Sequence, residues 1–482
     1  MTTTSVDEAL RAAAAAAGPC ARTTPTARAG MLTAVADALE AERAALVATA
    51  DAETSLGTAR LGGELTRTTF QLRLFADEVR TGAFYDVRLD RPDPEWPTGP
   101  RPDLRRYRTA AGPVLVFAAS NFPFAFSVAG GDTASAWAAG CPVVVKAHPG
   151  HPELSRRTAA VLHRALTEAG APAGTFALIE GEAEGVAALR HPALAAAAFT
   201  GSQRGGLALA KVAAERDTPI PFYGELGSIN PVVVTPGAAE ARAAGIAEGY
   251  VGSLTQGAGQ FCTNPGLLFV PATPAGQMLV EEIATRLREV PAAPMLGGWI
   301  ADGYLAGARR LAEQPGVRTL VRPQGPEDAA APGPRLLTMD LAAFTAAGEA
   351  VTEECFGPLG LVVTYDDAAA LDDVIAVLPG QLTASLHAEP AEAESVSALA
   401  GALAARCGRL LWNQWPTGVS VTPAMQHGGP FPATTAPATT SVGTAAMERF
   451  LRPVTYQSCP QELLPPPLRD DNPWGVPQRV SG

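Results

Sequence analysis

The sequence is short of charge, of paired cysteines and of long hydrophobic runs, and each shortage excludes a class of protein. Charged residues make up 17% of the 482 residues, the net charge is −12, and Lys and Arg form no cluster. Phosphate contacts need clustered basic side chains, so no nucleic-acid partner is expected. No apolar stretch approaches the ~20 residues that span a bilayer, so we expect no membrane partner either.

The cysteines and the first residues bear on where the protein works. The six cysteines lie far apart and include no Cys-x-x-Cys pair, so neither a disulfide framework nor a structural zinc site is indicated, and no metal is expected. The start of the chain is acidic where an export signal needs basic residues, and the alanine run at 12–17 is short. These features predict a soluble, cytoplasmic protein.

What is present is enough apolar sequence for several cores. Apolar residues make up 47% of the chain, and its length favours two or three domains. Residues 5–80 show helical spacing, prolines interrupt residues 92–102, and residues 104–108 are expected to form an edge strand. Short apolar runs then alternate with helical segments, and five of them are predicted to be buried parallel strands: 114–118, 143–146, 175–180, 195–199 and 231–235.

This alternation predicts an α/β fold with a doubly wound, Rossmann-type sheet, the usual support for a nucleotide cofactor. A second α/β segment follows Glu225, with strands expected at 267–270, 359–365 and 409–412. The predicted division has three parts: a cofactor-binding domain at 1–96 and 112–227 with part of 420–440, a catalytic domain at 228–419, and an oligomerisation element with the C-terminal tail at 97–111 and 441–482.

One cysteine lies in an open loop directly before an expected strand. Residues 259–266 read GQFCTNPG, which places Cys262 among glycines. A thiolate nucleophile needs open backbone so that a carbonyl compound can approach it. Most cysteines are inert buried residues, but this context favours a reactive thiol.

A single carboxylate lies between glycines in residues 222–231, FYGELGSINP. If Glu225 is desolvated there, its pKa should be raised, which suits a base that takes a proton from water. A helix cap or a surface turn would look the same. Residues 119–126, ASNFPFAF, follow the first buried strand, where Asn121 could donate to an oxyanion or simply form a turn.

Two further motifs suit a dinucleotide. Lys146 ends an expected strand, from which its ammonium group could reach a ribose or phosphate, although many such lysines only reach solvent. Residues 199–206, FTGSQRGG, follow a strand and open a helix, so Gly201 and Ser202 could receive a pyrophosphate. The segment lacks the Gly-x-Gly-x-x-Gly pattern, and Ser202 could equally be a helix cap.

Together these motifs resemble the aldehyde dehydrogenase superfamily, in the family's order and from about Ala12 to Gly482. The resemblance implies that Cys262 is the nucleophile, Glu225 the general base, and Asn121 with the Cys262 backbone N–H the oxyanion hole. It implies that six residues bind NADP or NAD: Lys146, Ser202, Gly201, Leu226, and from EECFGP at 353–358 Glu354 and Phe356.

The C-terminal motifs resemble one subgroup, the 2,5-dioxovalerate (α-ketoglutarate semialdehyde) dehydrogenases and their NADP-linked fatty aldehyde dehydrogenase relatives. These motifs are NQWPTGV at 413–419, HGGPFPATT at 427–435, FLRPV at 450–454 and ELLPP at 462–466. On this resemblance His427 is expected to be a structural turn residue. The substrate is expected to be 2,5-dioxovalerate or a medium to long aldehyde, in a pocket formed by Phe126, Gln256, Phe261, Thr263 and Trp415.

Three questions stay open at this point. A CoA-acylating or phosphorylating enzyme would not need the water-activating Glu225, and a catalytically silent protein could keep the fold. Both NADP and NAD are expected to be used, because Lys146 suits a 2′-phosphate whereas Glu182 or Glu184 would repel it. Unpaired strand edges in the small element favour a homodimer or homotetramer.

Overall fold

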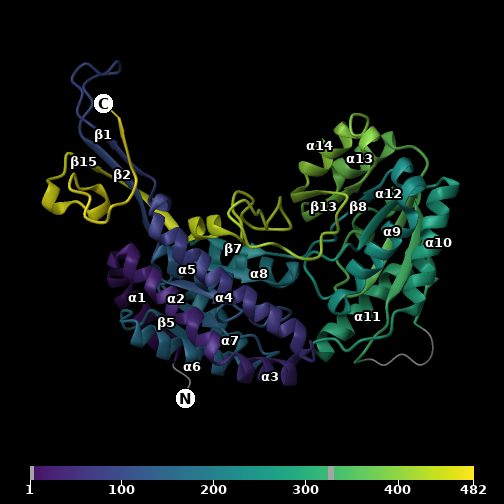
Figure 1. Ribbon diagram of the computed structural model, residues 1–482, viewed down its shortest axis with the longest axis horizontal. Helices are drawn as coiled ribbons and strands as arrows, with labels where there is room; N and C mark the ends of the chain where they lie inside the picture. Colours follow the sequence, from purple (N-terminus) through teal and green to yellow (C-terminus); the bar gives the residue numbers. More distant parts are fainter. Residues whose placement is uncertain (1–4, 324–329, 482) are drawn as a thin grey trace.

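A computed structural model describes residues 5–323 and 330–481, arranged as two lobes and a projecting arm (Figure 1). The predicted domain ranges also include residues 1–4, 324–329 and 482, which lie outside the described residues. No helix of the described chain is both long and apolar enough to cross a membrane.

The cofactor lobe is built on a five-stranded parallel sheet. Its strands, in spatial order, are β5 (Phe176–Ile179), β4 (Val143–Lys146), β3 (Val114–Phe117), β6 (Ala196–Thr200) and β7 (Phe222–Glu225). The connecting helices are α5 (Gly131–Ala139), α6 (Pro152–Glu168), α7 (Glu182–Arg190) and α8 (Gln203–Ala214). Four N-terminal helices complete the lobe: α1 (Val6–Arg22), α2 (Pro25–Ala41), α3 (Arg43–Thr54) and α4 (Thr58–Thr81).

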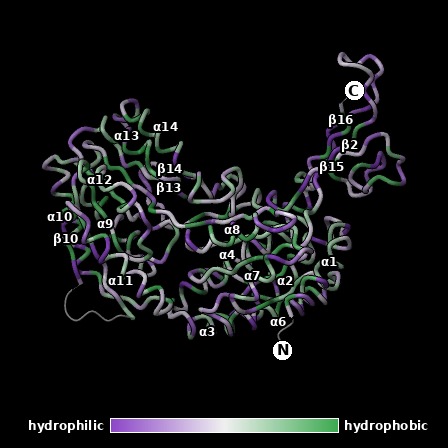
Figure 2. Tube along the Cα trace, turned by 180° about the vertical axis from the view of Figure 1, so that it is seen from behind, coloured by the Kyte–Doolittle hydropathy of each residue, from purple (hydrophilic) through white to green (hydrophobic). Residues whose placement is uncertain are grey.

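The apolar strand runs are continuous because both faces of this sheet are covered. In β3, Val114 and Val116 belong to the core shared with α2, α4, α5 and α6. Leu115 and Phe117 belong to the opposite core, with α1 and α7. Successive side chains of a strand point to opposite faces, so the run fills both cores. The outer helices show alternating hydrophobic and hydrophilic stretches (Figure 2).

The catalytic lobe contains a seven-stranded sheet, parallel except for the β10–β11 pair. Its strands in order are β10 (Arg318–Val321), β11 (Arg335–Asp340), β12 (Leu359–Tyr365), β9 (Leu267–Pro271), β8 (Val232–Val234), β13 (Gln381–His387) and β14 (Cys407–Trp412). Its helices are α9 (Pro236–Thr255), α10 (Pro274–Glu289), α11 (Gly298–Ala312), α12 (Leu341–Ala347), α13 (Ala369–Val377) and α14 (Ser397–Ala404).

The arm is a four-stranded sheet made from distant parts of the chain. Its order is β15 (Leu451–Gln457), β2 (Leu104–Ala110), β1 (Val87–Asp90) and β16 (Gln478–Ser481). The expectation of an edge strand at 104–108 is therefore wrong, because β15 and β1 pair with the two sides of β2. The predicted start of this element at residue 97 is also too late, since β1 already belongs to it.

Short 3₁₀ helices connect the larger elements: η1 (Ala83–Tyr85), η2 (Gln256–Gly259), η3 (Gly348–Val351), η4 (Pro390–Glu392), η5 (Thr444–Phe450), η6 (Gln461–Leu463) and η7 (Pro466–Leu468). Of these, η5 packs against α5, so part of the 441–482 segment lies on the cofactor lobe and not in the arm. The strand expected at 231–235 is β8, which belongs to the catalytic sheet, and β7 takes the fifth place in the cofactor sheet.

Candidate active site

The parallel strands of the cofactor sheet place four of the predicted motifs at one edge. The loop with Asn121 follows β3, Lys146 ends β4, Gly201 and Ser202 follow β6, and Glu225 ends β7. Loops at the carboxyl ends of parallel strands meet outside the same edge of the sheet, where such folds bind their ligands. Cys262 reaches this edge from the catalytic lobe, in the loop between η2 and β9.

The loop that carries Cys262 is held by local geometry and by one buried side chain. Gly257 and Gly259 have positive φ values of 55° and 69°, a conformation that side chains with a Cβ adopt rarely. The Nδ2 of Asn230 donates to the carbonyl oxygens of Cys262 and Asn264, each at 2.9 Å. Asn230 is fully buried, so these bonds fix the loop directly behind the thiol.

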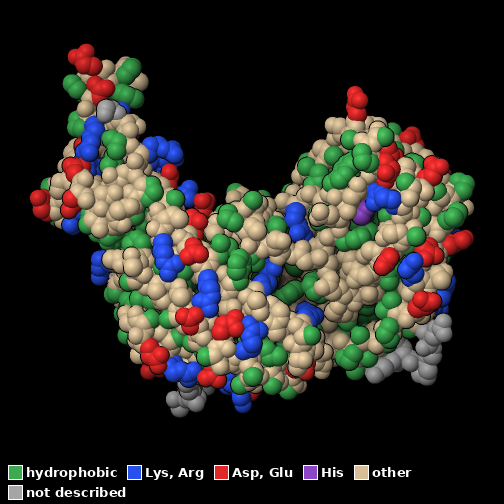
Figure 3. All heavy atoms as spheres, viewed as in Figure 1, with side chains coloured by type: hydrophobic (Ala, Val, Ile, Leu, Met, Phe, Trp, Pro, Cys, Tyr) green, Lys and Arg blue, Asp and Glu red, His purple; other side chains and the backbone are tan. Residues whose placement is uncertain are grey.

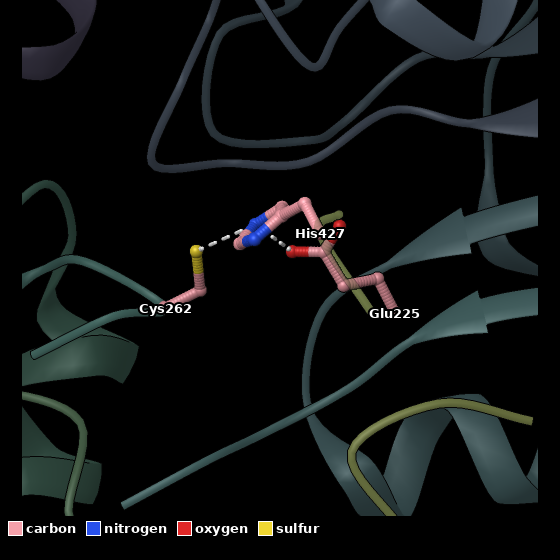
Figure 4. A group of neighbouring side chains, drawn as sticks. All are labelled: Glu225, Cys262 and His427. Atoms are coloured by element: carbon pink, nitrogen blue, oxygen red, sulfur yellow. Dashed lines mark hydrogen bonds and ion pairs between the residues drawn. The ribbon is translucent and has the colours of Figure 1, made fainter. Parts of the chain in front are cut away.

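Cys262, His427 and Glu225 form one contact group (Figure 4). The Nε2 of His427 lies 3.6 Å from the Sγ of Cys262 and 2.9 Å from Oε1 of Glu225. His427 is fully buried, and its Nδ1 has no hydrogen-bond partner. His427 was expected to be only a structural turn residue. This expectation is wrong, because its ring lies between the thiol and the carboxylate.

Glu225 is buried, yet its pKa is lowered and not raised. Burial alone would raise the pKa, but contact with His427 and the Ser441 hydroxyl, which donates to Oε2, outweighs it, and the charge of Arg449 adds to the effect. The expected raised pKa is thus wrong, because partners from the C-terminal segment hold Glu225 as a carboxylate. Residues 222–231 gave no sign of them.

The Cys262 thiol has a pKa raised well above its ordinary value by burial and by the charges of Glu225 and Glu354, which only Arg67 partly offsets. A thiol next to a carboxylate stays protonated at rest. Its activation therefore needs a proton acceptor at the moment of attack, and the Nε2 of His427 is within reach of Sγ.

Asn121 lies where an oxyanion donor is required. It lines the same cleft as Cys262, and its Nδ2 donates to the carbonyl oxygen of Gln260 at 3.1 Å. A carboxamide nitrogen carries two hydrogens, so this bond leaves one N–H for a second acceptor. The bond also ties the Asn121 loop of the cofactor lobe to the Cys262 loop of the catalytic lobe.

A cleft of about 770 Å³ runs from Asn121, Glu225 and Cys262 along the edge of the cofactor sheet. It is lined by all six residues predicted to bind the cofactor: Lys146, Gly201, Ser202, Leu226, Glu354 and Phe356. Figure 3 shows the hollow between the lobes, with Lys and Arg side chains at its rim. The cleft thus joins the predicted cofactor residues to the thiol.

The donors and acceptors of the cleft fit a dinucleotide. Thr200 has a buried hydroxyl without a partner, directly before Gly201. Ser202 caps α8 by accepting from the Gly205 N–H at 3.2 Å, so it is a helix cap at a helix N-terminus that faces the cleft. Burial raises the pKa of Glu354 to about 7, and burial lowers the pKa of Lys146. These groups suit phosphate and ribose partners.

The residues predicted for the substrate pocket do not all gather in one place. Phe126 and Phe261 both contact the Phe122 ring, with centroids 5.5 and 5.2 Å apart. Phe126 is also 6.4 Å from the ring of His427. Thr263 is buried and Gln256 is exposed. Trp415 packs instead on His387 and Tyr250, so its ring lies against α9 and β13.

Comparison with known proteins identifies this arrangement. The model of the aldehyde dehydrogenase family matches residues 1–431. The chain belongs to the aldehyde dehydrogenase family. It is therefore an NAD(P)-dependent oxidoreductase that oxidises aldehydes to carboxylates, and the cysteine and glutamate mechanism is general for this family.

Two relatives are similar over nearly the whole chain. Alpha-ketoglutaric semialdehyde dehydrogenase 2 of Azospirillum brasilense is 47% identical over 458 residues, 95% of this chain and 87% of that protein. Alpha-ketoglutaric semialdehyde dehydrogenase of Acinetobacter baylyi is 42% identical over 477 residues, 99% of this chain and 91% of that protein. Both relatives lie in the subgroup that the C-terminal motifs indicated.

Solved aldehyde dehydrogenases confirm the fold. Aldehyde dehydrogenase 21 of Physcomitrella patens has a TM-score of 0.78 at 21% identity, covering 94% of this chain and 89% of that one. Methylmalonate-semialdehyde dehydrogenase of Oceanimonas doudoroffii has a TM-score of 0.78 at 20% identity, covering 95% and 92%. The predicted Rossmann-type architecture is thus confirmed.

The sequence did not reveal five residues that shape the site. They are His427, Ser441, Asn230, Arg449 and Phe122, which contact or act on Glu225, Cys262 or the aromatic pocket. Asn230 and Phe122 carried a local signal, since they stand in the motifs at 222–231 and 119–126. The others come from segments too distant in sequence for spacing to connect them with the thiol.

Proposed function

We propose that the protein oxidises alpha-ketoglutaric semialdehyde (2,5-dioxovalerate) to the dicarboxylate through a thioester on Cys262. The proposal is carried by the similarity to two proteins with this named activity over 95% and 99% of the chain. The contact of Cys262 Sγ with His427 and of His427 with Glu225 supports the covalent chemistry.

Acylation begins with the loss of the thiol proton. In the tautomer that carries its hydrogen on Nδ1, His427 takes this proton on Nε2 as the sulfur of Cys262 bonds to the aldehyde carbon, and the new N–H then donates to Oε1 of Glu225. The resulting oxyanion accepts hydrogen bonds from the Asn121 carboxamide and the Cys262 backbone N–H. Bound NAD(P)+ supplies the hydride acceptor. An acyl group then remains on the sulfur as a thioester.

Deacylation uses the carboxylate. Glu225 takes a proton from a water molecule as its oxygen bonds to the acyl carbon, and the carbon–sulfur bond breaks to release the thiolate. The lowered pKa keeps Glu225 ionised at neutral pH, so it is available as a base. A base beside the thiol favours hydrolysis over transfer of the acyl group to CoA or phosphate.

The cofactor residues in the cleft divide into three pairs. Lys146 and Glu354 suit the ribose groups, while Gly201 and Ser202 at the start of α8 suit the pyrophosphate. Leu226 and Phe356 line the cleft beside Glu225 and Cys262, where the nicotinamide must lie. We propose that both NADP+ and NAD+ are used, since Lys146 favours a 2′-phosphate and Glu182 in the same cleft opposes it.

The experiment is absorbance at 340 nm with 2,5-dioxovalerate and either NAD+ or NADP+, without CoA. We expect reduction of both cofactors and release of the free dicarboxylate. Cys262→Ala should abolish turnover and keep cofactor binding, because the thiol carries chemistry and little packing. Turnover that requires CoA, or oxidation of long-chain aldehydes only, would overturn the proposal.

A further inference from the structure

Three arginines lie near the Cys262 loop but outside the cofactor cleft. The guanidinium carbon of Arg60, on α4, lies 5.0 Å from the Phe261 ring centroid and 5.3 Å from that of Phe122. Arg67, two turns later on α4, lies 5.8 Å from the Phe126 ring. The third, Arg409, is on β14. None of the three lines the cofactor cleft.

The arginines are close to the reacting groups. The Nη2 of Arg60 donates to the backbone carbonyl oxygen of Asn121 at 2.7 Å, and its Nη1 lies against Gly257 before the Cys262 loop. The charge of Arg67 lowers the pKa of Cys262, and the charge of Arg409 attracts the Cys262 thiolate electrostatically. A ligand at Cys262 would therefore extend towards these cations.

Their charge is not balanced within the protein. Among the ion pairs of the described residues, none includes Arg60, Arg67 or Arg409. Glu64 is the one acid whose charge acts on both helix arginines. Its Oε1 already accepts hydrogen bonds from the backbone N–H groups of Phe124 and Ala125, at 2.7 and 2.9 Å. Burial raises the pKa of Glu64 to about 7, so it is only partly ionised at neutral pH.

Hydrogen-bond donors are also left over. The Nη1 of Arg60 and the Nε of Arg67 are buried and have no hydrogen-bond partner. Leaving buried charged donors without partners is costly unless an anion completes them. Two partly buried guanidinium groups that lack an ion-pair partner and lie near a nucleophile are thus the pattern of an anion site.

A purely structural role explains only part of this pattern. Arg67 donates to the carbonyl oxygen of Val419, and Arg409 donates to those of Pro416 and Gly418 at 2.7 and 3.0 Å. These bonds hold the 416–419 loop in place. A neutral donor such as glutamine could hold carbonyl oxygens as well, so the bonds do not account for the uncompensated charge.

We infer that Arg60 and Arg67 bind the far carboxylate of a semialdehyde whose aldehyde carbon lies at Cys262 Sγ. The inference rests on the proposed function and names the residues that select its substrate class. Phe122, Phe126 and Phe261 supply the apolar wall for the carbon chain between the two ends. Arg409 adds positive potential from β14. Guanidinium groups match carboxylates better than ammonium groups do, because they donate two parallel hydrogen bonds.

The test compares a carboxylated aldehyde with a neutral aldehyde of similar length, 2,5-dioxovalerate and pentanal, in Arg60→Met and Arg67→Met. A charge-assisted hydrogen bond corresponds to about 10- to 100-fold in binding. We expect kcat/KM for 2,5-dioxovalerate to fall by about this factor relative to kcat/KM for pentanal, mainly through KM. Arg67→Lys should recover part of the loss.

The control is Arg73→Met on the same helix. Arg73 is partly exposed and pairs with Asp37 at 2.8 Å, so this variant should leave the kcat/KM of both substrates unchanged. A wild-type measurement covers the case in which a variant does not fold: glutarate should inhibit pentanal oxidation competitively, and its neutral dimethyl ester should not.

Separate outcomes overturn the two proposals. Equal losses for both aldehydes in the Met variants, or equal inhibition by glutarate and its ester, would show that the arginines only hold the loops. An unchanged preference for 2,5-dioxovalerate in both variants would also reject the arginine assignment while the proposed function stands. A wild-type enzyme that oxidises pentanal and not 2,5-dioxovalerate would reject the proposed substrate and this inference with it.

Discussion

A single ring nitrogen of His427 faces both partners of the chemistry. Nε2 lies 3.6 Å from Cys262 Sγ and 2.9 Å from Glu225 Oε1, while Nδ1 is buried without a partner. In a serine protease triad the acid orients the histidine through the other nitrogen. Here the proton taken from the thiol lies on the nitrogen that faces the carboxylate, so Glu225 stabilises the imidazolium of His427 and itself stays ionised.

The position of His427 was hidden from sequence reasoning for a physical reason. It is followed by Gly428, Gly429 and Pro430, a composition typical of turns. Its contact with Cys262 joins residues 165 positions apart, and such contacts leave no trace in local periodicity. Cys262 and Glu225 were found because the glycines around them are local in the chain.

Cofactor preference can be tested at Glu182. This residue begins α7 and lines the cleft, and its charge acts on Lys146. A like charge near a 2′-phosphate costs on the order of 1 kcal/mol at an exposed site. We predict that Glu182→Gln raises kcat/KM for NADP+ several-fold relative to NAD+ in steady-state assays.

The neighbouring Glu184 provides a matched control. It is also on α7, but it does not line the cleft, and its carboxylate lies against Gly181. Glu184→Gln should leave the ratio of the two cofactors unchanged. If Glu182→Gln leaves the ratio unchanged as well, then Glu182 does not face the ribose and Lys146 sets the balance.

At the scale of elements, strands with uniform apolar runs were predicted, some with their exact bounds, whereas mixed strands were predicted less accurately or missed. β4 and β12 have the predicted bounds, Val143–Lys146 and Leu359–Tyr365. β13 was missed because its buried face carries Gln381, Thr383 and Ser385. Gln381 and Thr383 are buried because they bond to Ser228 and Asn230 near the site, and only the tertiary structure reveals such partners.

The contact between α4 and the Asn121 loop gives a prediction about stability. Glu64 accepts two backbone hydrogen bonds from this loop, and burial raises its pKa from 4.5 to about 7. Between these values the folded protein keeps a proton that the unfolded chain has lost. The free energy of unfolding should therefore fall as pH rises through this window, by at most about 3 kcal/mol from this group.

Glu64→Gln keeps an acceptor oxygen and has no proton to lose. We predict that the Tm of this variant falls less between pH 5 and 7 than that of the wild type, measured by differential scanning calorimetry in matched buffers. Parallel Tm curves over this range would contradict the raised pKa of Glu64.

At the scale of the whole molecule, the arm stands away from both lobes (Figure 1). Its edge strands β15 and β16 leave backbone groups unpaired in the described chain, and the exposed Val480 lies on β16. Unpaired edges attract a further chain. We predict a homodimer or homotetramer, so light scattering after size exclusion should give two or four times the 49.5 kDa chain mass. A mass of one chain would contradict this.

The active site depends on the lobes together, since each contributes part of the chemistry. Asn121 and Glu225 come from the cofactor lobe, Cys262 from the catalytic lobe, and His427 from the segment that returns between them. Acylation uses Cys262 and His427, whereas deacylation uses Glu225. Glu225→Gln keeps an oxygen that can accept from His427 but has no base for water, so it should separate the two half-reactions.

The most direct test is the pre-steady-state time course of Glu225→Gln with 2,5-dioxovalerate and NAD(P)+. We predict a burst of about one reduced cofactor per active site followed by a stall, because the thioester forms and its hydrolysis lacks a base. Mass spectrometry of the stalled enzyme should find one acyl group on the peptide that contains Cys262. A linear trace at the wild-type rate, with no acyl group on Cys262, would contradict the account.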